Sequence, residues 1–486
     1  MNKQNKRQPK VVIIGAGMTG ILVAIKLREA GIDDVIILEK KSKIGGTWRE
    51  NTYPGVACDI PAHMYTYSFE PNPNWSHRFP HGDEIQAYFE HVAEKYQVMP
   101  LIRFNQAVVS CHFKDAKWTL STDTGDTLVA DFVVSATGIL HHPAKPDIPG
   151  LDSFAGDCFH TAEWDHQVDM ADKKVGVIGT GSTAAQVIPE LLKVADKVSV
   201  FQRTPQWIVN LSNKFFSEKL RQRWSKKPER MHRLRRWYTF GVEQTFSKAV
   251  IGKKLQHGLV NLWCRLNLWL SIKDPSLRAK LTPNYRVGCK RIIVNTTFYK
   301  AIQKDNADLV TERIEKVVPE GVITKDGKRH DLDVLVLSTG FHPFNFMRPM
   351  DLRGKYGLKI DERWGQKVQA YRSLLIPDFP NFFLMLGPNT PIGNFSVIAM
   401  SEVQTGYILQ LIEKWQNQDF NEVSAKQSAL EAFNRYLKQG MEKTVWLGGC
   451  QSWYLDKDGD PAMWPYSWQQ WVNEMAEPEM NDLLLQ

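Results

Sequence analysis

The sequence has 486 residues, of which 43% are hydrophobic and 23% are charged. This length exceeds what one compact core supports, so we expect two or three domains with the composition of a folded globular protein. The six cysteines include no Cys-x-x-Cys pair, which argues against a disulfide framework, a zinc ribbon or a dithiol redox centre and favours a reducing, cytoplasmic location. We expect no metal site, and no apolar run approaches the roughly 20 residues that span a bilayer.

The first predicted unit is a strand, a glycine-rich turn and a helix near the start of the chain. The β-branched run Val11–Ile14 is typical of a buried strand, and a helix is predicted over 21–30. A second apolar run, Val35–Leu38, ends on Glu39. Glycines in the turn allow a pyrophosphate to approach the backbone and the helix N-terminus, while the acid bonds ribose hydroxyls. The predicted dinucleotide contacts are Gly15, Gly17, Met18, Thr19, Gly20 and Glu39.

Two later runs share one pattern, an apolar strand followed by a small polar turn. They are 132–138 (FVVSATG) and 334–340 (VLVLSTG). We interpret both as crossings between two domains. A discontinuous first domain would comprise 1–145 and 335–486, and a second domain over 146–334, which contains the dinucleotide unit described next, would be inserted in it. The predicted fold class is α/β, with two Rossmann-like domains.

The second dinucleotide unit lies inside this insertion. Lys174–Ile178 is predicted as a strand, the turn is Gly179-Thr180-Gly181-Ser182-Thr183-Ala184, and a helix follows to about residue 194. Ala184 stands in place of the third glycine, where a small residue suffices for packing. The next strand, 198–201, leads to Arg203.

The spacing of the two units is the same, but the residue at the end differs. Glu39 follows Gly15 by 24 positions, and Arg203 follows Gly179 by 24 positions. A carboxylate repels a 2′-phosphate, whereas a guanidinium binds one bidentately. We therefore expect FAD at the first unit and NADPH, in preference to NADH, at the second. A solvated surface arginine is the alternative for Arg203.

A basic, aromatic insertion is predicted over about 207–283. Residues 214–254 contain 13 Lys or Arg against three acids, a balance of +10 that leaves −2 for the rest of the chain out of a total of +8. Helices are predicted over 220–238 and 260–272. One interpretation is a helical subdomain over the active site with solvated charges. The other is a surface over 214–272 that associates weakly with anionic lipid. Nucleic acid is not an expected partner, because no recognition module accompanies the charge.

One segment, 154–165 (FAGDCFHTAEWD), resembles the FxGxxxHxxxW fingerprint of class B flavoprotein monooxygenases. Its ending in Asp165 is similar to the Baeyer–Villiger branch of that family. Further stretches similar to the family lie in 45–65 (with GGTWR and YPGVACDI), 201–205 (FQRTP), 288–291 (GCKR) and 450–454 (CQSWY). The resemblance extends from residue 11 to about residue 464.

The resemblance implies an enzyme that uses FAD, NADPH and O2 to convert a small hydrophobic ketone to an ester or lactone through a flavin C4a-peroxide. Carried over by position, the further FAD contacts are Thr47, Trp48, Asp59 and Tyr65, and further expected cofactor contacts are Gly46, Ala57, Cys58 and Val108. The implied NADP contacts are Thr180, Gly181, Ser182, Thr183, Ala184, Ala185, Gln186, Arg203, Thr204 and Lys290, and Arg291 is a further expected cofactor contact. Trp453 is expected near a cofactor, and Asn394-Phe395-Ser396 departs from the family pattern beside the substrate pocket.

The resemblance assigns catalysis to Arg291, held in place by Asp59. A peroxide anion that attacks a ketone needs a fixed positive charge, and an arginine keeps its charge at working pH. A structural salt bridge is the alternative for this pair, and a solvated lysine is the alternative for Lys290. His160 is expected to be a packed residue with no catalytic role.

Two other functions remain open at this stage. An N- or S-oxygenating enzyme could use the same fold, and a peripheral membrane protein could keep a cofactor without turnover. A flavin disulfide reductase is excluded by the missing Cys-x-x-Cys pair.

Overall fold

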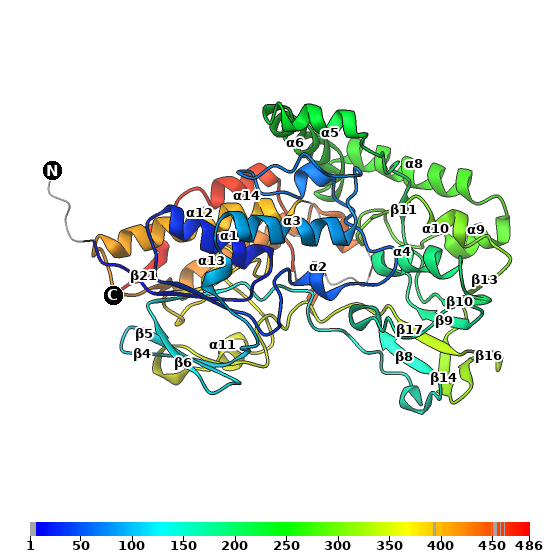
Figure 1. Cartoon of the computed structure of the whole chain (residues 1–486), viewed down its shortest axis with the longest axis horizontal. Helices are drawn as coiled ribbons and strands as arrows, with labels where there is room; N and C mark the ends of the chain where they lie inside the picture. Colours follow the sequence, from blue (N-terminus) through cyan, green and yellow to red (C-terminus); the bar gives the residue numbers. More distant parts are fainter. Residues whose placement is uncertain (1–5, 392–394, 449, 451–453, 457, 461) are drawn as a thin grey trace.

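The computed structural model describes residues 6–391, 395–448, 450, 454–456, 458–460 and 462–486. Figure 1 shows two α/β halves, with a group of helices above them. Each half is built around a five-stranded parallel sheet. The predicted α/β class with two dinucleotide-type sheets is therefore confirmed.

The first sheet has the strand order β19-β7-β1-β2-β3. Its strands are β1 (Val11–Ile14), β2 (Val35–Leu38), β3 (Ile102–Arg103), β7 (Phe132–Ser135) and β19 (Phe382–Leu384). All four residues of β1 are buried because both faces of the sheet are covered. Val11 and Ile13 face one core, while Val12 and Ile14 face another.

Helices cover one face of the first sheet, and a second sheet covers the other. The helices include α1 (Met18–Glu29), α3 (Gly82–Lys95) and α12 (Val397–Gln416). The covering sheet is β4 (Val108–Lys114), β5 (Lys117–Thr122), β6 (Thr127–Ala130) and β18 (Asp351–Arg353). The other elements of this half include α2 (Thr47–Glu50), α11 (Ile360–Trp364), α13 (Gln427–Met441), α14 (Trp468–Glu474), β20 (Val423–Ala425) and β21 (Leu483–Leu485).

The second sheet repeats this arrangement in the order β13-β10-β9-β17-β8. Its strands are β8 (Asp157–His160), β9 (Lys174–Ile178), β10 (Lys197–Phe201), β13 (Ala307–Val310) and β17 (Val334–Leu337). One face packs on α4 (Ser182–Leu191) and α10 (Phe298–Ala301). The other packs on the antiparallel strands β14 (Ile314–Val318), β15 (Gly321–Thr324) and β16 (Arg329–Asp331).

The chain passes between the two sheets along two neighbouring segments. The first follows β7, and the second follows β17. Ala144 and Gly340 are joined by a backbone hydrogen bond of 2.8 Å, so the two crossings lie side by side. Because β17 pairs with β8 and β9, it belongs to the second sheet. The expected boundary between residues 334 and 335 therefore cuts a strand, and the crossing itself begins after Leu337.

The insertion forms the green helices at the top of Figure 1 and α9 at its right-hand side. They are α5 (Glu218–Ser225), α6 (Glu229–Val242), α7 (Lys248–Val250), α8 (Lys254–Ser271) and α9 (Pro275–Leu281), with the two-residue strands β11 (Ile208–Val209) and β12 (Ile293–Val294) below them. The single helix expected over 220–238 is wrong. Pro228 disfavours helical geometry at the preceding residue, so the chain forms two helices instead. Among the described residues, no helix has the combination of length and apolar character needed to cross a bilayer.

Candidate functional site

The first glycine-rich turn brings three stretches of backbone close together. Gly15 has φ +105°, and a Cβ there would lie 2.7 Å from the carbonyl oxygen of Ala136 on the first crossing. A Cβ on Gly46 would lie 3.2 Å from the Cα of Gly17. Only glycine allows this approach and this conformation. The turn is thus open to a ligand that must reach the backbone.

Glu39 stands at the end of β2 with its carboxylate directed to this turn. It is buried and accepts hydrogen bonds from the backbone N–H of Ala16 (2.8 Å) and of Lys41 (3.0 Å). The geometry fits a dinucleotide whose ribose hydroxyls reach the carboxylate and whose pyrophosphate lies at the N-terminus of α1.

The third glycine of the first turn has no room for a methyl group. A Cβ on Gly20 would lie 1.9 Å from the carbonyl oxygen of Gly15. Ala184 holds the equivalent place in the second turn, where its methyl group is buried in the core.

We expect Gly20→Ala to lower the melting temperature by several degrees, because overpacking costs about 1–3 kcal/mol. The matched variant Ala184→Gly should cost about 1 kcal/mol or less. Thermal unfolding of both variants checks this, and equal melting temperatures would contradict it.

The second turn repeats the geometry of the first. Gly179 has φ +118°, and a Cβ there would lie 2.3 Å from the carbonyl oxygen of Ser338 on the second crossing. The Thr180 hydroxyl donates to the carbonyl of Thr204 at 2.8 Å, which ties the turn to the segment after β10. Each turn therefore faces one crossing.

Two cations stand close together beside the second turn. Arg203 is exposed at the end of β10, and Lys290 is partly buried. Burial and then the positive charge of Arg203 lower the pKa of Lys290. An anion between the two side chains would relieve this repulsion, so the pair fits a phosphate group.

A cavity of about 830 Å³ connects the two turns. The predicted site residues that line it are Gly15, Gly17, Met18, Thr19, Glu39, Gly46, Thr47, Trp48, Ala57, Cys58, Asp59, Tyr65, Val108, Gly181, Ser182, Thr183, Gln186 and Arg291. The predicted site residues outside its lining are Gly20, Thr180, Ala184, Ala185, Arg203, Thr204 and Lys290. Of these, Gly20, Thr180, Ala184 and Ala185 are buried, while Arg203 and Lys290 form the cationic pair described above.

Arg291 and Asp59 form a bidentate ion pair at the wall of this cavity. The Arg291 Nε donates to Asp59 Oδ2 at 3.0 Å, and Nη2 donates to Oδ1. Burial alone would lower the pKa of Arg291, but the Asp59 carboxylate outweighs burial and holds the pKa above its usual value. Tyr454 is also hydrogen-bonded to Arg291. The guanidinium therefore stays charged and has a fixed orientation.

Other predicted residues connect the two halves or support the cavity wall. Gln186 on α4 donates to the carbonyl of Ala57 at 2.9 Å and accepts from the Tyr53 hydroxyl at 2.8 Å. Trp48 Nε1 donates to the Tyr65 hydroxyl at 3.0 Å. Trp453 and Asn394 lie outside the described residues.

His160 is packed, as expected from the sequence. Its ring lies against Phe341, with the ring centroids 5.6 Å apart, and its Nδ1 accepts a hydrogen bond from the Ala162 N–H.

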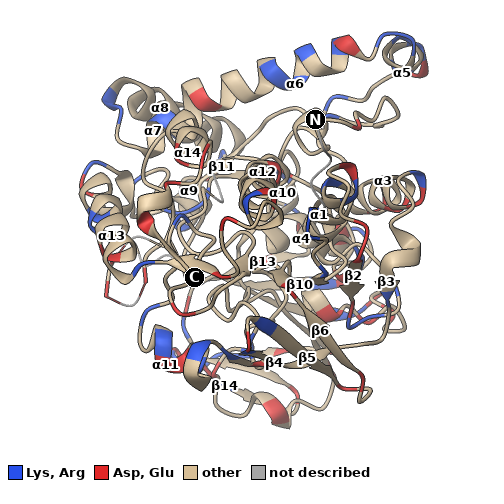
Figure 2. Ribbon diagram, turned by 90° about the vertical axis from the view of Figure 1, so that its left-hand side faces the viewer, with Lys and Arg blue, Asp and Glu red and all other residues tan. Residues whose placement is uncertain are grey.

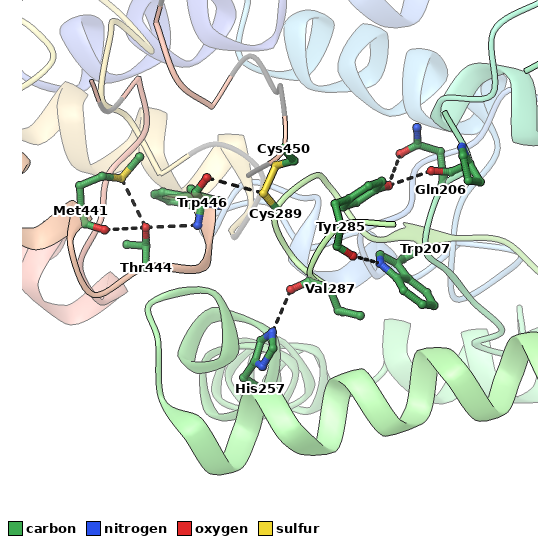
Figure 3. The surroundings of a disulfide bond; sticks show 11 residues. Gln206, Trp207, His257, Tyr285, Val287, Cys289, Met441, Thr444, Trp446 and Cys450 are labelled. Atoms are coloured by element: carbon green, nitrogen blue, oxygen red, sulfur yellow. Dashed lines mark hydrogen bonds between the residues drawn. A yellow bond between two sulfur atoms is a disulfide. The ribbon is translucent and has the colours of Figure 1, made fainter. Parts of the chain in front are cut away.

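One disulfide corrects the expectation for the cysteines. Cys289, which directly precedes Lys290, is bonded to Cys450, 161 positions later (Figure 3). The remaining cysteines, Cys58, Cys111, Cys158 and Cys264, are free. The spacing in the sequence gave no sign of this pair, because only the folded chain brings the C-terminal segment against residue 289.

Sequence reasoning also missed several residues of the cavity. The two crossings line it with 136–142 and 338–341, whereas the sequence pattern predicts only that the chain leaves each sheet at these turns. Their strand–turn pattern, present in both halves, was the available signal. Tyr454 was noted in a family-like stretch without a role.

Comparison with known proteins identifies the family to which the chain belongs. Residues 12–233 match a family model described as pyridine nucleotide-disulphide oxidoreductase. The chain is 46% identical to an uncharacterized monooxygenase of Mycobacterium tuberculosis, covering 95% of this chain and 93% of that protein. It is 38% identical to a Baeyer–Villiger monooxygenase of Streptomyces coelicolor, covering 96% of this chain and 90% of that protein.

Solved structures agree with these relatives over nearly the whole chain. A steroid monooxygenase bound to NADP matches with a TM-score of 0.87 at 27% identity, over 99% of both chains. The cyclohexanone monooxygenase of a Rhodococcus species, bound to NADP+, matches with a TM-score of 0.87 at 26% identity, also over 99% of both chains. Together with the two dinucleotide turns and the cavity between them, these matches show that the chain belongs to the Baeyer–Villiger monooxygenase family of flavoenzymes.

Proposed function

We propose that this protein binds FAD at the first turn and NADPH at the second, and oxidises a small hydrophobic ketone to an ester or lactone with Arg291 as its catalytic arginine. The observation that carries the proposal is the Arg291–Asp59 pair at the cavity that joins the two turns. FAD, when bound, supplies the acceptance of hydride from NADPH and the activation of O2.

The first turn would hold the FAD. Backbone N–H groups at the start of α1 would bind the pyrophosphate, and Glu39 would bond the ribose hydroxyls. Trp48 and Tyr65, joined by their hydrogen bond, would form part of the wall around the ring system.

Arg291 would stabilise the negative charge that develops on oxygen during ketone oxidation. A guanidinium is suited to this because it remains protonated and its donors have a fixed geometry. Asp59 would orient it through two hydrogen bonds, and Tyr454 would hold it from another side. This permanent charge favours ketone oxidation over N- or S-oxygenation, where the attacking group is a soft nucleophile.

The substrate would occupy the apolar part of the cavity. Ile60, Leu386, Phe395 and Val397 contribute to its lining, and they would exclude water from the reacting groups. This lining supports a hydrophobic carbonyl compound as the substrate class.

A panel of ketones and sulfides tests the reaction directly. We expect a yellow protein whose NADPH oxidation requires O2, with an ester or lactone as the product identified by mass spectrometry. Sulfoxide formation without any ester would favour the N- or S-oxygenating alternative. A flavin-loaded protein with no turnover would favour a binding role.

Glu39→Ala should release the flavin. Loss of the ribose contact would yield largely FAD-free protein after purification, with activity partly restored by added FAD. The ratio of absorbance at 450 nm to that at 280 nm measures the loading. Because Glu39 also accepts two backbone hydrogen bonds, Glu39→Gln serves as the matched variant that keeps an acceptor. Full loading of Glu39→Ala would show that the first turn does not hold FAD.

A further inference from the structure

Helix α8 has two apolar faces. Its inner face, with Val260, Cys264 and Leu268, is buried in the core of the second half. Its outer side chains recur every three or four residues and are 45 to 72% exposed: Leu255, Leu259, Leu262, Leu266, Trp269 and Leu270. With 3.6 residues per turn, the two sets lie on opposite sides of the helix. We call the six exposed residues the outer stripe. A surface helix normally presents polar residues on that side, so the exposed apolar stripe indicates a surface that binds a partner.

The surroundings of the outer stripe are basic. From Lys248 to Lys273 the sequence has five Lys or Arg and no acid. Figure 2 shows charges of both signs along α6, the helix that precedes this region, whose sequence has four arginines and one acid. A partner for this surface would therefore be apolar at its centre and anionic around it. Two copies related by a two-fold axis would place these cations against one another, which disfavours self-association.

A groove of about 420 Å³ adjoins the outer stripe, between α8, α9 and Trp207. Three side chains of the stripe line it, together with Arg265 and Arg278. The Arg265 guanidinium lies 5.4 Å from the centre of the Trp207 ring, and Arg278 donates to the carbonyl of Ile272 at 3.0 Å. Both guanidinium groups are thus held at the groove. An apolar groove beside two guanidinium groups suits an acyl chain joined to a phosphate diester.

We propose that the outer stripe and its groove dock the protein on an anionic phospholipid bilayer, with α8 lying in the plane of the headgroups. Helices of this kind bury their apolar face at the boundary of the acyl chains, while neighbouring cations bind anionic lipid. The proposal goes beyond the reaction and does not depend on it, because the outer stripe shares no residue with the lining of the cofactor cavity.

Sedimentation with lipid vesicles tests the proposal on the full-length, flavin-loaded enzyme. The vesicles are pure phosphatidylcholine, or phosphatidylcholine with about one third phosphatidylglycerol. We expect the enzyme to sediment with the anionic vesicles at least ten-fold more than with the neutral ones, and to be released by 0.5 M salt because exposed charges are screened. The double variant Leu259→Glu/Leu266→Glu should lose this binding at least ten-fold and keep the NADPH oxidation rate of the parent.

The matched control is Val129→Glu/Val194→Glu, which adds the same charge at two exposed apolar residues away from α8. It should bind vesicles within two-fold of the parent. Equal loss in both double variants, equal binding to neutral and anionic vesicles, or no binding at all would overturn the proposal. Absence of vesicle binding with a dimer that the α8 variant dissociates, measured by light scattering, would assign the surface to a second copy of the chain.

Discussion

In the Arg291→Ala variant, we expect NADPH still to reduce the bound flavin while ester formation falls about 100- to 1000-fold. Hydride transfer depends on the orientation of the nicotinamide over the flavin. The oxygenation step needs a positive charge close to the reacting oxygen, which Arg291 would supply from a partly buried position beside Asp59. The O2 consumed should leave as hydrogen peroxide. Stopped-flow absorbance measures flavin reduction, and product analysis measures ester yield.

Two further variants test whether the loss of ester formation depends on the guanidinium group of Arg291. Arg291→Lys should recover little activity, because a single ammonium group does not reproduce the two hydrogen bonds that the guanidinium donates to Asp59. Arg353→Ala removes an arginine that pairs with Asp351 in the sheet covering the first half, and it should leave both steps unchanged. Ester formation by Arg291→Ala at a near-native rate would remove Arg291 from the mechanism.

Arg203→Ala should raise the KM for NADPH by roughly 10- to 150-fold and leave the KM for NADH nearly unchanged. A charge-assisted hydrogen bond to phosphate contributes about 1.5–3 kcal/mol, and each 1.4 kcal/mol corresponds to a factor of ten. Because NADH lacks the 2′-phosphate, it cannot lose this contact. Steady-state kinetics with both cofactors give the two ratios.

Arg329→Ala is the matched control for this variant. Arg329 is an exposed arginine of the same half, on β16, where it pairs with Asp331. It should change neither KM. An equal rise in KM for both cofactors in Arg203→Ala would show that Arg203 does not recognise the phosphate and that its charge acts in some other way.

The local parts of this site could be predicted from the sequence, because strand, turn and helix follow one another within about 30 residues. The two turns and their different end residues, Glu39 and Arg203, were found in this way. The pairing of Arg291 with Asp59 could not be derived from spacing, since 232 positions separate them, and it entered through the family resemblance. The structure then placed the two side chains in contact.

Other features depend on contacts that no local pattern encodes. β17 and β7 have the same kind of apolar run, yet β17 pairs with β8 and β9, so sheet membership had to come from the fold. The break between α5 and α6 differs, because Pro228 is a local signal that by itself predicts a helix boundary at this point of the sequence.

The disulfide between Cys289 and Cys450 has a consequence for how the chain is connected. It closes residues 289–450 into a covalent ring that runs through the second sheet, along the second crossing and into the first half. The backbone at Lys290 and Arg291 thus begins one residue from a cross-link whose Cα atoms are 6.2 Å apart. Any rotation of the second half against the first must keep Cys289 and Cys450 together, so the segment with Lys290 and Arg291 stays tethered to the C-terminal segment at Cys450.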